Sequence, residues 1–261
     1  MTALGIFAGL IVSQLPSRMT GLNDAQTKRT FTACVGLLNY GYVPIPLIDA
    51  LFPGDTHISG TLFTAFLGAE ISLWTITLLT MQGNFDKASL YRIINIPIIT
   101  ILVSVPLNIL FLQSPDCKAF AAPVLDFLLN GQYGPVHLIS SAAIPLALLM
   151  IGLSITELLE IKPVAARFPV LLKIALCSCL VRLFILPALL IAAAVFLPCT
   201  LEIKRVMVVY AAMASAILPI ALAKHYGGST ETAFDTCMSN TLVSLFTSPV
   251  WITAGLYFIG G

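Results

Sequence analysis

Residues 37–47 read Leu-Leu-Asn-Tyr-Gly-Tyr-Val-Pro-Ile-Pro-Leu and lie inside an apolar run, about 31–52, that is long enough to cross a bilayer. Pro44 and Pro46 lack a backbone N–H and clash with the carbonyl four residues earlier, so together they should break a helix. In hydrocarbon such a break is tolerated only where protein or a watery cavity satisfies the freed carbonyls. A helix broken at membrane mid-depth is typical of the binding site of a secondary transporter.

The composition predicts an all-α polytopic membrane protein. Apolar residues make up 58% of the chain and charged residues only 10%, whereas soluble domains carry about 25% charged residues. A net charge of +1 gives no reason to expect a nucleic-acid partner. The six cysteines lack metal-site spacing, and no H-E-x-x-H, G-x-S-x-G or phosphate-binding glycine loop occurs. We therefore expect no enzyme, no cofactor and no metal site.

Eight apolar runs follow one another, at about 2–16, 31–52, 58–81, 91–113, 136–158, 168–197, 206–224 and 233–258. A spanning helix needs about 20 residues, so the first run reads as a span clipped at its start. This suggests that the chain begins part-way through a larger architecture.

The loops predict the orientation of these spans. Eight basic residues lie in one alternate set of connections: Arg18, Lys28, Arg29, Lys87, Arg92, Lys162, Arg167 and Lys224. The other set holds three, Lys118, Lys204 and Arg205. Basic residues favour the cytoplasmic side, so both termini are expected outside.

A second break is expected at Pro219, because small residues from Ala211 to Ala216 precede it and permit close approach of another helix. Spans one to three match spans six to eight in order, so equivalent members are five positions apart in the series of spans. The two triplets then have opposite orientations. This pattern predicts an inverted repeat whose broken helices meet near the midplane.

Few charges lie inside spans. Glu70 and Arg182 each sit near the middle of one. An intramembrane charge normally faces the bundle interior, where it is paired or functional. Two interpretations stay open: a buried Glu70–Arg182 ion pair, or a coupling role with Glu70 as a proton carrier. Asp235 and Lys224 lie at span ends, where helix capping and interfacial anchoring are expected.

At the two breaks the sequence resembles the auxin efflux carrier family. Asn39 lies seven residues before Pro46 and Leu47, as in the family's Asn-x6-Pro-Leu segment. Residues 218–227, Leu-Pro-Ile-Ala-Leu-Ala-Lys-His-Tyr-Gly, resemble the stretch after its second crossover proline. Residues 144–152 and 183–187 are also similar to family segments.

The resemblance implies ten helices in two inverted repeats, with a transport domain and a dimerising scaffold. Residues 1–90 would form an N-terminally incomplete first repeat with its crossover at 39–46. Residues 91–261 would form the second, with scaffold helices in 91–158 and transport helices in 168–258, crossing at 215–219. The first two helices of the family have no counterpart here. The resemblance also implies a bacterial inner membrane and a possible homodimer.

The candidate substrate-binding residues follow from the breaks. Free N–H groups and partial positive charge at half-helix N-termini attract anions, and Asn39 and Ser215 can hydrogen-bond a carboxylate. Pro46 and Pro219 shape the two breaks, and Tyr40 could line the site. A structural role stays open for Asn39, and simple packing for Tyr40 and Tyr42.

We therefore expect a secondary transporter of small organic anions in a lipid bilayer, coupled to protons or sodium. The resemblance supplies the carboxylate substrate class. Two alternatives remain: a truncated or inactive membrane component, and a sodium-coupled bile-acid-type symporter.

Overall fold

The computed structural model describes residues 2–19, 22, 24–83 and 164–260, together with 99, 100, 102–104, 106, 107, 109, 119, 122, 123, 134, 135, 138, 142, 146 and 149. The chain divides into two compact units, Met1–Ile93 with Lys162–Gly261, and Ile94–Ile161. The spans expected at 91–113 and 136–158 lie almost wholly outside the described residues. The first unit contains both breaks.

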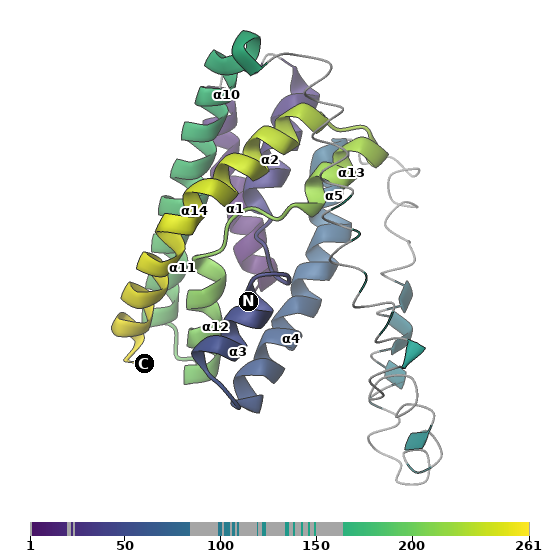
Figure 1. Ribbon diagram of the computed structural model, residues 1–261, viewed down its shortest axis with the longest axis vertical. Coiled ribbons are helices and arrows are strands. Elements are labelled where there is room, and N and C mark those ends of the chain that lie inside the picture. The colour runs from purple at the N-terminus through teal and green to yellow at the C-terminus, as the bar shows by residue number, and fades with distance from the viewer. Residues whose placement is uncertain are drawn as a thin grey trace. The chain divides into compact units, whose positions relative to one another are not determined.

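All regular elements in the described part of the first unit are helical (Figure 1). In chain order they are α1 (Thr2–Met19), α2 (Ala25–Gly36), α3 (Pro44–Leu51), α4 (Thr56–Ser72), η1 (Leu73–Thr77), α5 (Leu78–Gln82), α10 (Val164–Cys179), η3 (Leu180–Ile185), α11 (Leu186–Phe196), α12 (Leu201–Ala211), α13 (Leu218–Tyr226) and α14 (Thr230–Ile259). The two η elements are π-helical segments inside longer helices.

Three continuous helical stretches are long and apolar enough to cross a membrane. They are Thr56–Gln82, Phe168–Phe196 and Thr230–Ile259, with 27, 29 and 30 residues. They correspond to the expected spans at 58–81, 168–197 and 233–258. The expected spans at 31–52 and 206–224 each consist of two half-helices, α2 with α3 and α12 with α13. The described part is thus an all-helical membrane protein.

Three helices begin with a polar side chain that caps their first turn. Asp24 accepts from the backbone N–H of Thr27 at 3.0 Å, and this hydrogen bond lowers the pKa of Asp24. Asp55 caps α4 and Ser229 caps α14 in the same way. Such caps satisfy backbone donors that the first turn leaves free.

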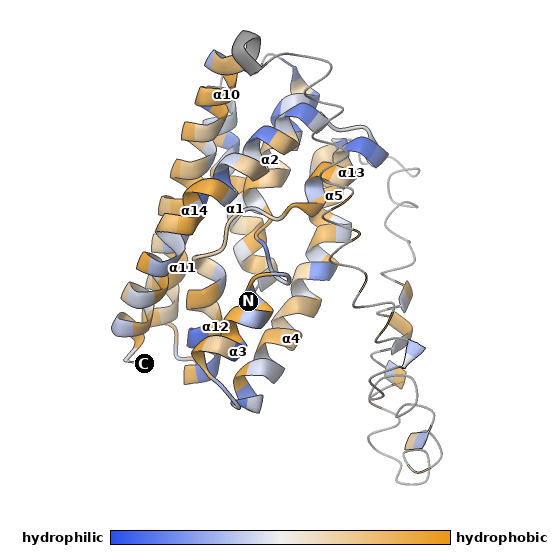
Figure 2. Cartoon of the chain, in the orientation of Figure 1, coloured by the Kyte–Doolittle hydropathy of each residue, from blue (hydrophilic) through white to orange (hydrophobic). Residues whose placement is uncertain are grey.

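The helices of the unit are rich in apolar residues (Figure 2), and many of their large apolar side chains are exposed. On α14, Phe246 and Tyr257 are each 80% exposed and Leu245 is 67% exposed. Such a face is unfavourable in water and suits lipid chains.

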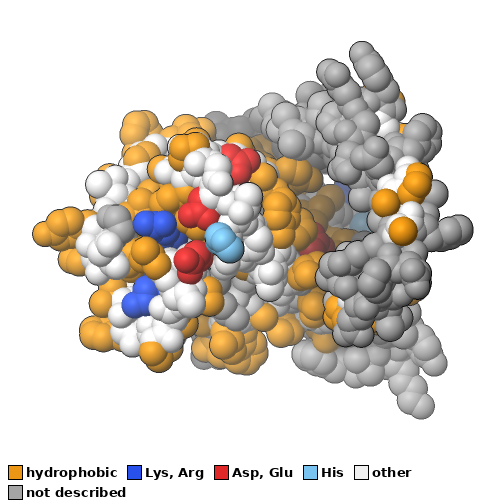
Figure 3. All heavy atoms as spheres, turned by 90° about the horizontal axis from the view of Figure 1, so that it is seen from below, with side chains coloured by type: hydrophobic (Ala, Val, Ile, Leu, Met, Phe, Trp, Pro, Cys, Tyr) orange, Lys and Arg blue, Asp and Glu red, His pale blue; other side chains and the backbone are white. Residues whose placement is uncertain are grey.

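Charged side chains gather at one end of the unit, where α3 ends and α4 and α12 begin (Figure 3). There Glu202 interacts electrostatically with Asp55 and His57, and the Arg205 guanidinium lies 4.9 Å from the centre of the Phe52 ring. The connections after α3 and before α12, which the loop charges assign to one side of the membrane, therefore share one end of the unit.

Candidate functional site

The two broken helices meet at their breaks. Leu38 and Ser215 form an isolated antiparallel bridge. It is flanked by two backbone hydrogen bonds, from Asn39 N to the carbonyl of Ala214 at 2.8 Å and from Ala216 N to the carbonyl of Leu37 at 2.9 Å. The non-helical segments 37–43 and 212–217 thus cross as a short two-stranded ribbon, which we call the crossing.

The register of this ribbon sends Asn39 and Ser215 to opposite faces. Leu38 and Ser215 are directly opposite, so their side chains share one face, and Asn39, the next residue, points to the other. The structure therefore brings the backbones of these candidate residues together and separates their side chains. The Asn39 side chain is 9% exposed and makes no hydrogen bond within the described part of the chain.

Three carbonyls of the second break accept hydrogen bonds from side chains of other helices. Ser248 Oγ donates to the carbonyl of Ala212 at 2.6 Å, and Cys237 Sγ donates to that of Ala216 at 3.0 Å. Arg182 Nε donates to the carbonyl of Met213 at 2.9 Å. These contacts meet the requirement that a break in hydrocarbon places on its surroundings.

The prolines lie just after each break, in the first turn of the half-helix that follows it. Pro44 is the first residue of α3 and Pro219 the second of α13, positions where a missing N–H costs little. The non-helical segment of the first break ends at Val43, before Pro46, and overlaps the crossover predicted at 39–46.

The prolines also change the anion site expected at the start of α3. Pro44 and Pro46 have no N–H, and Ile45 N already donates to the carbonyl of Gly41 at 3.2 Å. The first turn of α3 therefore offers a positive helix end without the free donors that the sequence led us to expect. The Asn39 amide, five residues before α3, is a side-chain donor without a partner among the described residues.

The Glu70 carboxylate lies beside the first break. Its Oε1 accepts from the Tyr40 hydroxyl at 2.9 Å and its Oε2 from Trp74 Nε1 at 3.0 Å. The Tyr40 ring also packs edge-on against Phe66, with centroids 5.1 Å apart. Of the candidate residues, Tyr40 is thus placed against Glu70.

Arg182, on η3, is 1% exposed and lies against the second break. Its guanidinium is well placed for the C-terminal end of half-helix α12, where backbone carbonyls carry partial negative charge. Glu70 and Arg182, for which an ion pair was one of two open interpretations, form no salt bridge with each other. Each side chain instead bonds a group near a different break.

A polar stripe on α14 was not anticipated as a whole. Thr232, Thr236, Asn240, Ser244 and Ser248 recur every four residues and so share one helix face. Fully buried Asn240 donates from Nδ2 to Ser215 Oγ at 2.8 Å, so the stripe reaches the crossing. The four-residue spacing of polar residues in an apolar span is the signal that could have revealed it.

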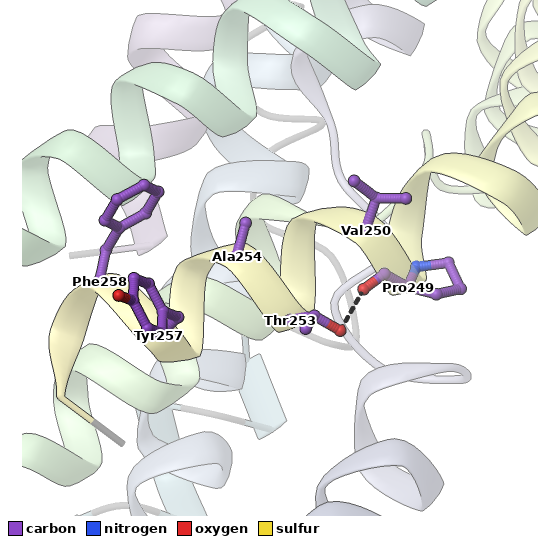
Figure 4. A pocket seen from close by; sticks show the side chains of 6 residues that line it. All are labelled: Pro249, Val250, Thr253, Ala254, Tyr257 and Phe258. Atoms are coloured by element: carbon purple, nitrogen blue, oxygen red, sulfur yellow. Dashed lines mark hydrogen bonds between the residues drawn. The ribbon is translucent and has the colours of Figure 1, made fainter.

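A shallow groove of about 610 Å³ lies elsewhere, along the outer face of α14 (Figure 4). It is lined by Pro249, Val250, Thr253, Ala254, Tyr257 and Phe258. None of the candidate residues contributes to it. Its apolar lining belongs to the lipid-facing surface and carries no chemistry of its own.

Residues 94–252 match the family model described as membrane transport protein, the family of the auxin efflux carriers. The match covers more than half of the chain and includes the second break. Comparison with curated proteins finds no match, and comparison with solved structures finds none either. By the family match, the chain belongs to the membrane transport protein family of auxin efflux carriers.

Proposed function

We propose that this chain is a secondary transporter of small organic carboxylate anions that works by alternating access. The observation that carries the proposal is the crossing, held by the hydrogen bonds between Asn39 and Ala214 and between Ala216 and Leu37. Two broken helices that meet inside an apolar bundle form the kind of site that transporters use. The carboxylate class comes from the family resemblance.

Helix capping supports an anion at the crossing. The helices α2, α4 and α14 have side-chain caps from Asp24, Asp55 and Ser229. The half-helices α3 and α13, which begin at the crossing, have none. Their positive ends are therefore not neutralised by a capping side chain, which favours an anionic ligand.

Asn39 is the donor that we assign to the substrate carboxylate. It is buried beside α3, and its amide makes no other hydrogen bond among the described residues. Ser215 is committed to Asn240, so we assign it to holding the second break in shape. Pro46 and Pro219 prevent α3 and α13 from continuing the helices on the other side of each break.

The test is flux of lactate, malonate, citrate and indole-3-acetate in proteoliposomes, with counterflow of labelled substrate as the basic measurement. Asn39→Ala should raise the KM of a transported anion roughly 10- to 100-fold, because a hydrogen bond to a charged group contributes about 1.5–3 kcal/mol. Thr253→Ala, on the exposed face of α14, is the matched control and should leave KM unchanged. Absence of flux for all four anions with the folded wild-type protein would refute the proposal.

A further inference from the structure

In the part of the chain that the structure describes, the intramembrane carboxylate of Glu70 has hydrogen-bond donors but no cation as a partner. Tyr40 and Trp74 each donate to one of its oxygens, and no Lys or Arg in the described part of the chain forms a salt bridge with it. An ionisable group inside a membrane is costly, and those that proteins retain there mark functional sites. Among the described residues no cation compensates its charge, and protonation is the other way to neutralise a carboxylate in apolar surroundings.

Tyr40 connects this carboxylate to both breaks. Its hydroxyl bonds Glu70 on α4, while its backbone carbonyl accepts from the Tyr210 hydroxyl at 3.1 Å. Tyr210 belongs to the last turn of α12, directly before the second break. Tyr40 thus links Glu70 on α4, through its hydroxyl, with Tyr210 beside the second break, through its backbone carbonyl.

We propose that Glu70 is the proton-binding residue of this transporter, and that Tyr40 transmits its protonation state to the crossing. The proposal rests on the proposed function, because it names the ion that moves with the anion.

The chemistry is a reversible protonation. A hydronium ion from one aqueous phase gives a proton to a Glu70 oxygen and leaves as water, and the proton returns to water on the other side. The ionised carboxylate accepts two charge-assisted hydrogen bonds, which are about twice as strong as neutral ones. In the protonated form the carboxyl is neutral and a poorer acceptor, so the hydrogen bonds from Tyr40 and Trp74 both weaken. Protonation therefore loosens the first break from α4.

The titratable and charged groups on the break and on the described helices against α4 are few. They are Tyr40 and Tyr42 on the break, Asp49 on α3, and Glu202, Lys204, Arg205 and Tyr210 on α12. Of these, Tyr40 makes the hydrogen bond to Glu70.

The first experiment measures protonation without transport. The chain has two tryptophans, so Trp251→Phe leaves Trp74 as a reporter hydrogen-bonded to Glu70. We measure the emission of Trp74 in detergent from pH 8 down to pH 4, expect it to change on acidification, and expect Glu70→Gln to abolish this change. A flat emission across that range would overturn the proton-binding role, whatever the transport assay shows.

The second experiment uses proteoliposomes and whichever of lactate, malonate, citrate and indole-3-acetate gives the largest counterflow. The accumulation of that anion driven by a pH gradient is measured and divided by its counterflow. This ratio reports how strongly transport is coupled to protons. Glu70→Gln should lower this ratio at least tenfold, and Tyr40→Phe should lower it as well. Asp49→Asn, an exposed carboxylate on α3, should leave the ratio unchanged.

The outcomes separate the two proposals. Wild-type accumulation that is driven by a sodium gradient and not by a pH gradient would overturn the proton role and leave the transporter function standing. An unchanged ratio in Glu70→Gln would also overturn the proton role and leave the transporter function standing. If Glu70→Gln does not fold, the ratio in Tyr40→Phe decides. Absence of any wild-type counterflow would overturn the proposed function and the coupling with it.

Discussion

Tyr210 takes the place of a backbone donor that the sequence removes. In a continuous helix the carbonyl of Tyr40 would accept from the N–H of residue 44, but Pro44 has none. The Tyr210 hydroxyl donates to this carbonyl at 3.1 Å and lies 3.5 Å from the carbonyl of Leu62. A single phenol therefore satisfies a carbonyl that the first break exposes.

Tyr210→Phe should lower the free energy of unfolding by about 1–3 kcal/mol, because it leaves a buried carbonyl without a donor. Thermal or SDS-induced unfolding of the purified protein in detergent measures the change. Tyr257→Phe is the control: Tyr257 is 80% exposed, so stability should stay within experimental error. Equal stability of the two variants would show that the break does not depend on this hydroxyl.

At the scale of elements, α1 and α2 approach each other at two glycines. A Cβ added to Gly36 would lie 2.6 Å from Leu10 Cδ2 and 3.0 Å from the backbone N of Leu10. One added to Gly9 would lie 3.1 Å from Gly36 Cα. The half-helix α2 is therefore held against α1 at a distance that only glycine allows.

Gly36→Ala should destabilise the protein by about 1–3 kcal/mol, since overfilling a close contact forces the backbones apart. Gly60→Ala makes the same chemical change in α4 at an exposed position where nothing lies within 4 Å of the new Cβ. That control should be neutral or stabilise by about 0.5–1 kcal/mol, because alanine favours the helix. Both values come from unfolding curves, and a neutral Gly36→Ala would contradict the close contact.

At the scale of the whole molecule, the crossing joins segments that are about two thirds of the chain apart. Leu38 and Ser215 form an antiparallel pair without mutual hydrogen bonds, for which the Cα atoms lie about 4.5 Å apart. That separation is within the range that a disulfide bridges. If transport moves the crossing as one body, a link across it should not stop the cycle.

The double variant Leu38→Cys with Ser215→Cys should form a disulfide on oxidation, seen as fragments that stay joined on a non-reducing gel after cleavage between the two positions. Counterflow should persist in the oxidised protein at the level of the reduced double variant. Leu38→Cys with Thr253→Cys is the control and should not cross-link. Loss of counterflow on oxidation, restored by reduction, would show that the two breaks must separate during transport.

The sequence alone determined the helical, membrane-embedded character of the chain and the places where two helices break. These follow from local physics: apolar residues partition into lipid, and proline has no N–H to continue a helix. The expected spans at 58–81, 168–197 and 233–258 are confirmed as membrane-capable helices. The family assignment, made on the short segments around Asn39 and Pro219, is also confirmed.

Only the tertiary structure decided the partners. Glu70 pairs with Tyr40 and Trp74, and Arg182 with a carbonyl of the second break, whereas the sequence equally allowed these two charges to pair with each other. The opposite directions of Asn39 and Ser215 depend on the register of the crossing, where a shift of one residue would reverse the face. Partner choice and register arise from contacts between residues far apart in the chain, which no local pattern encodes.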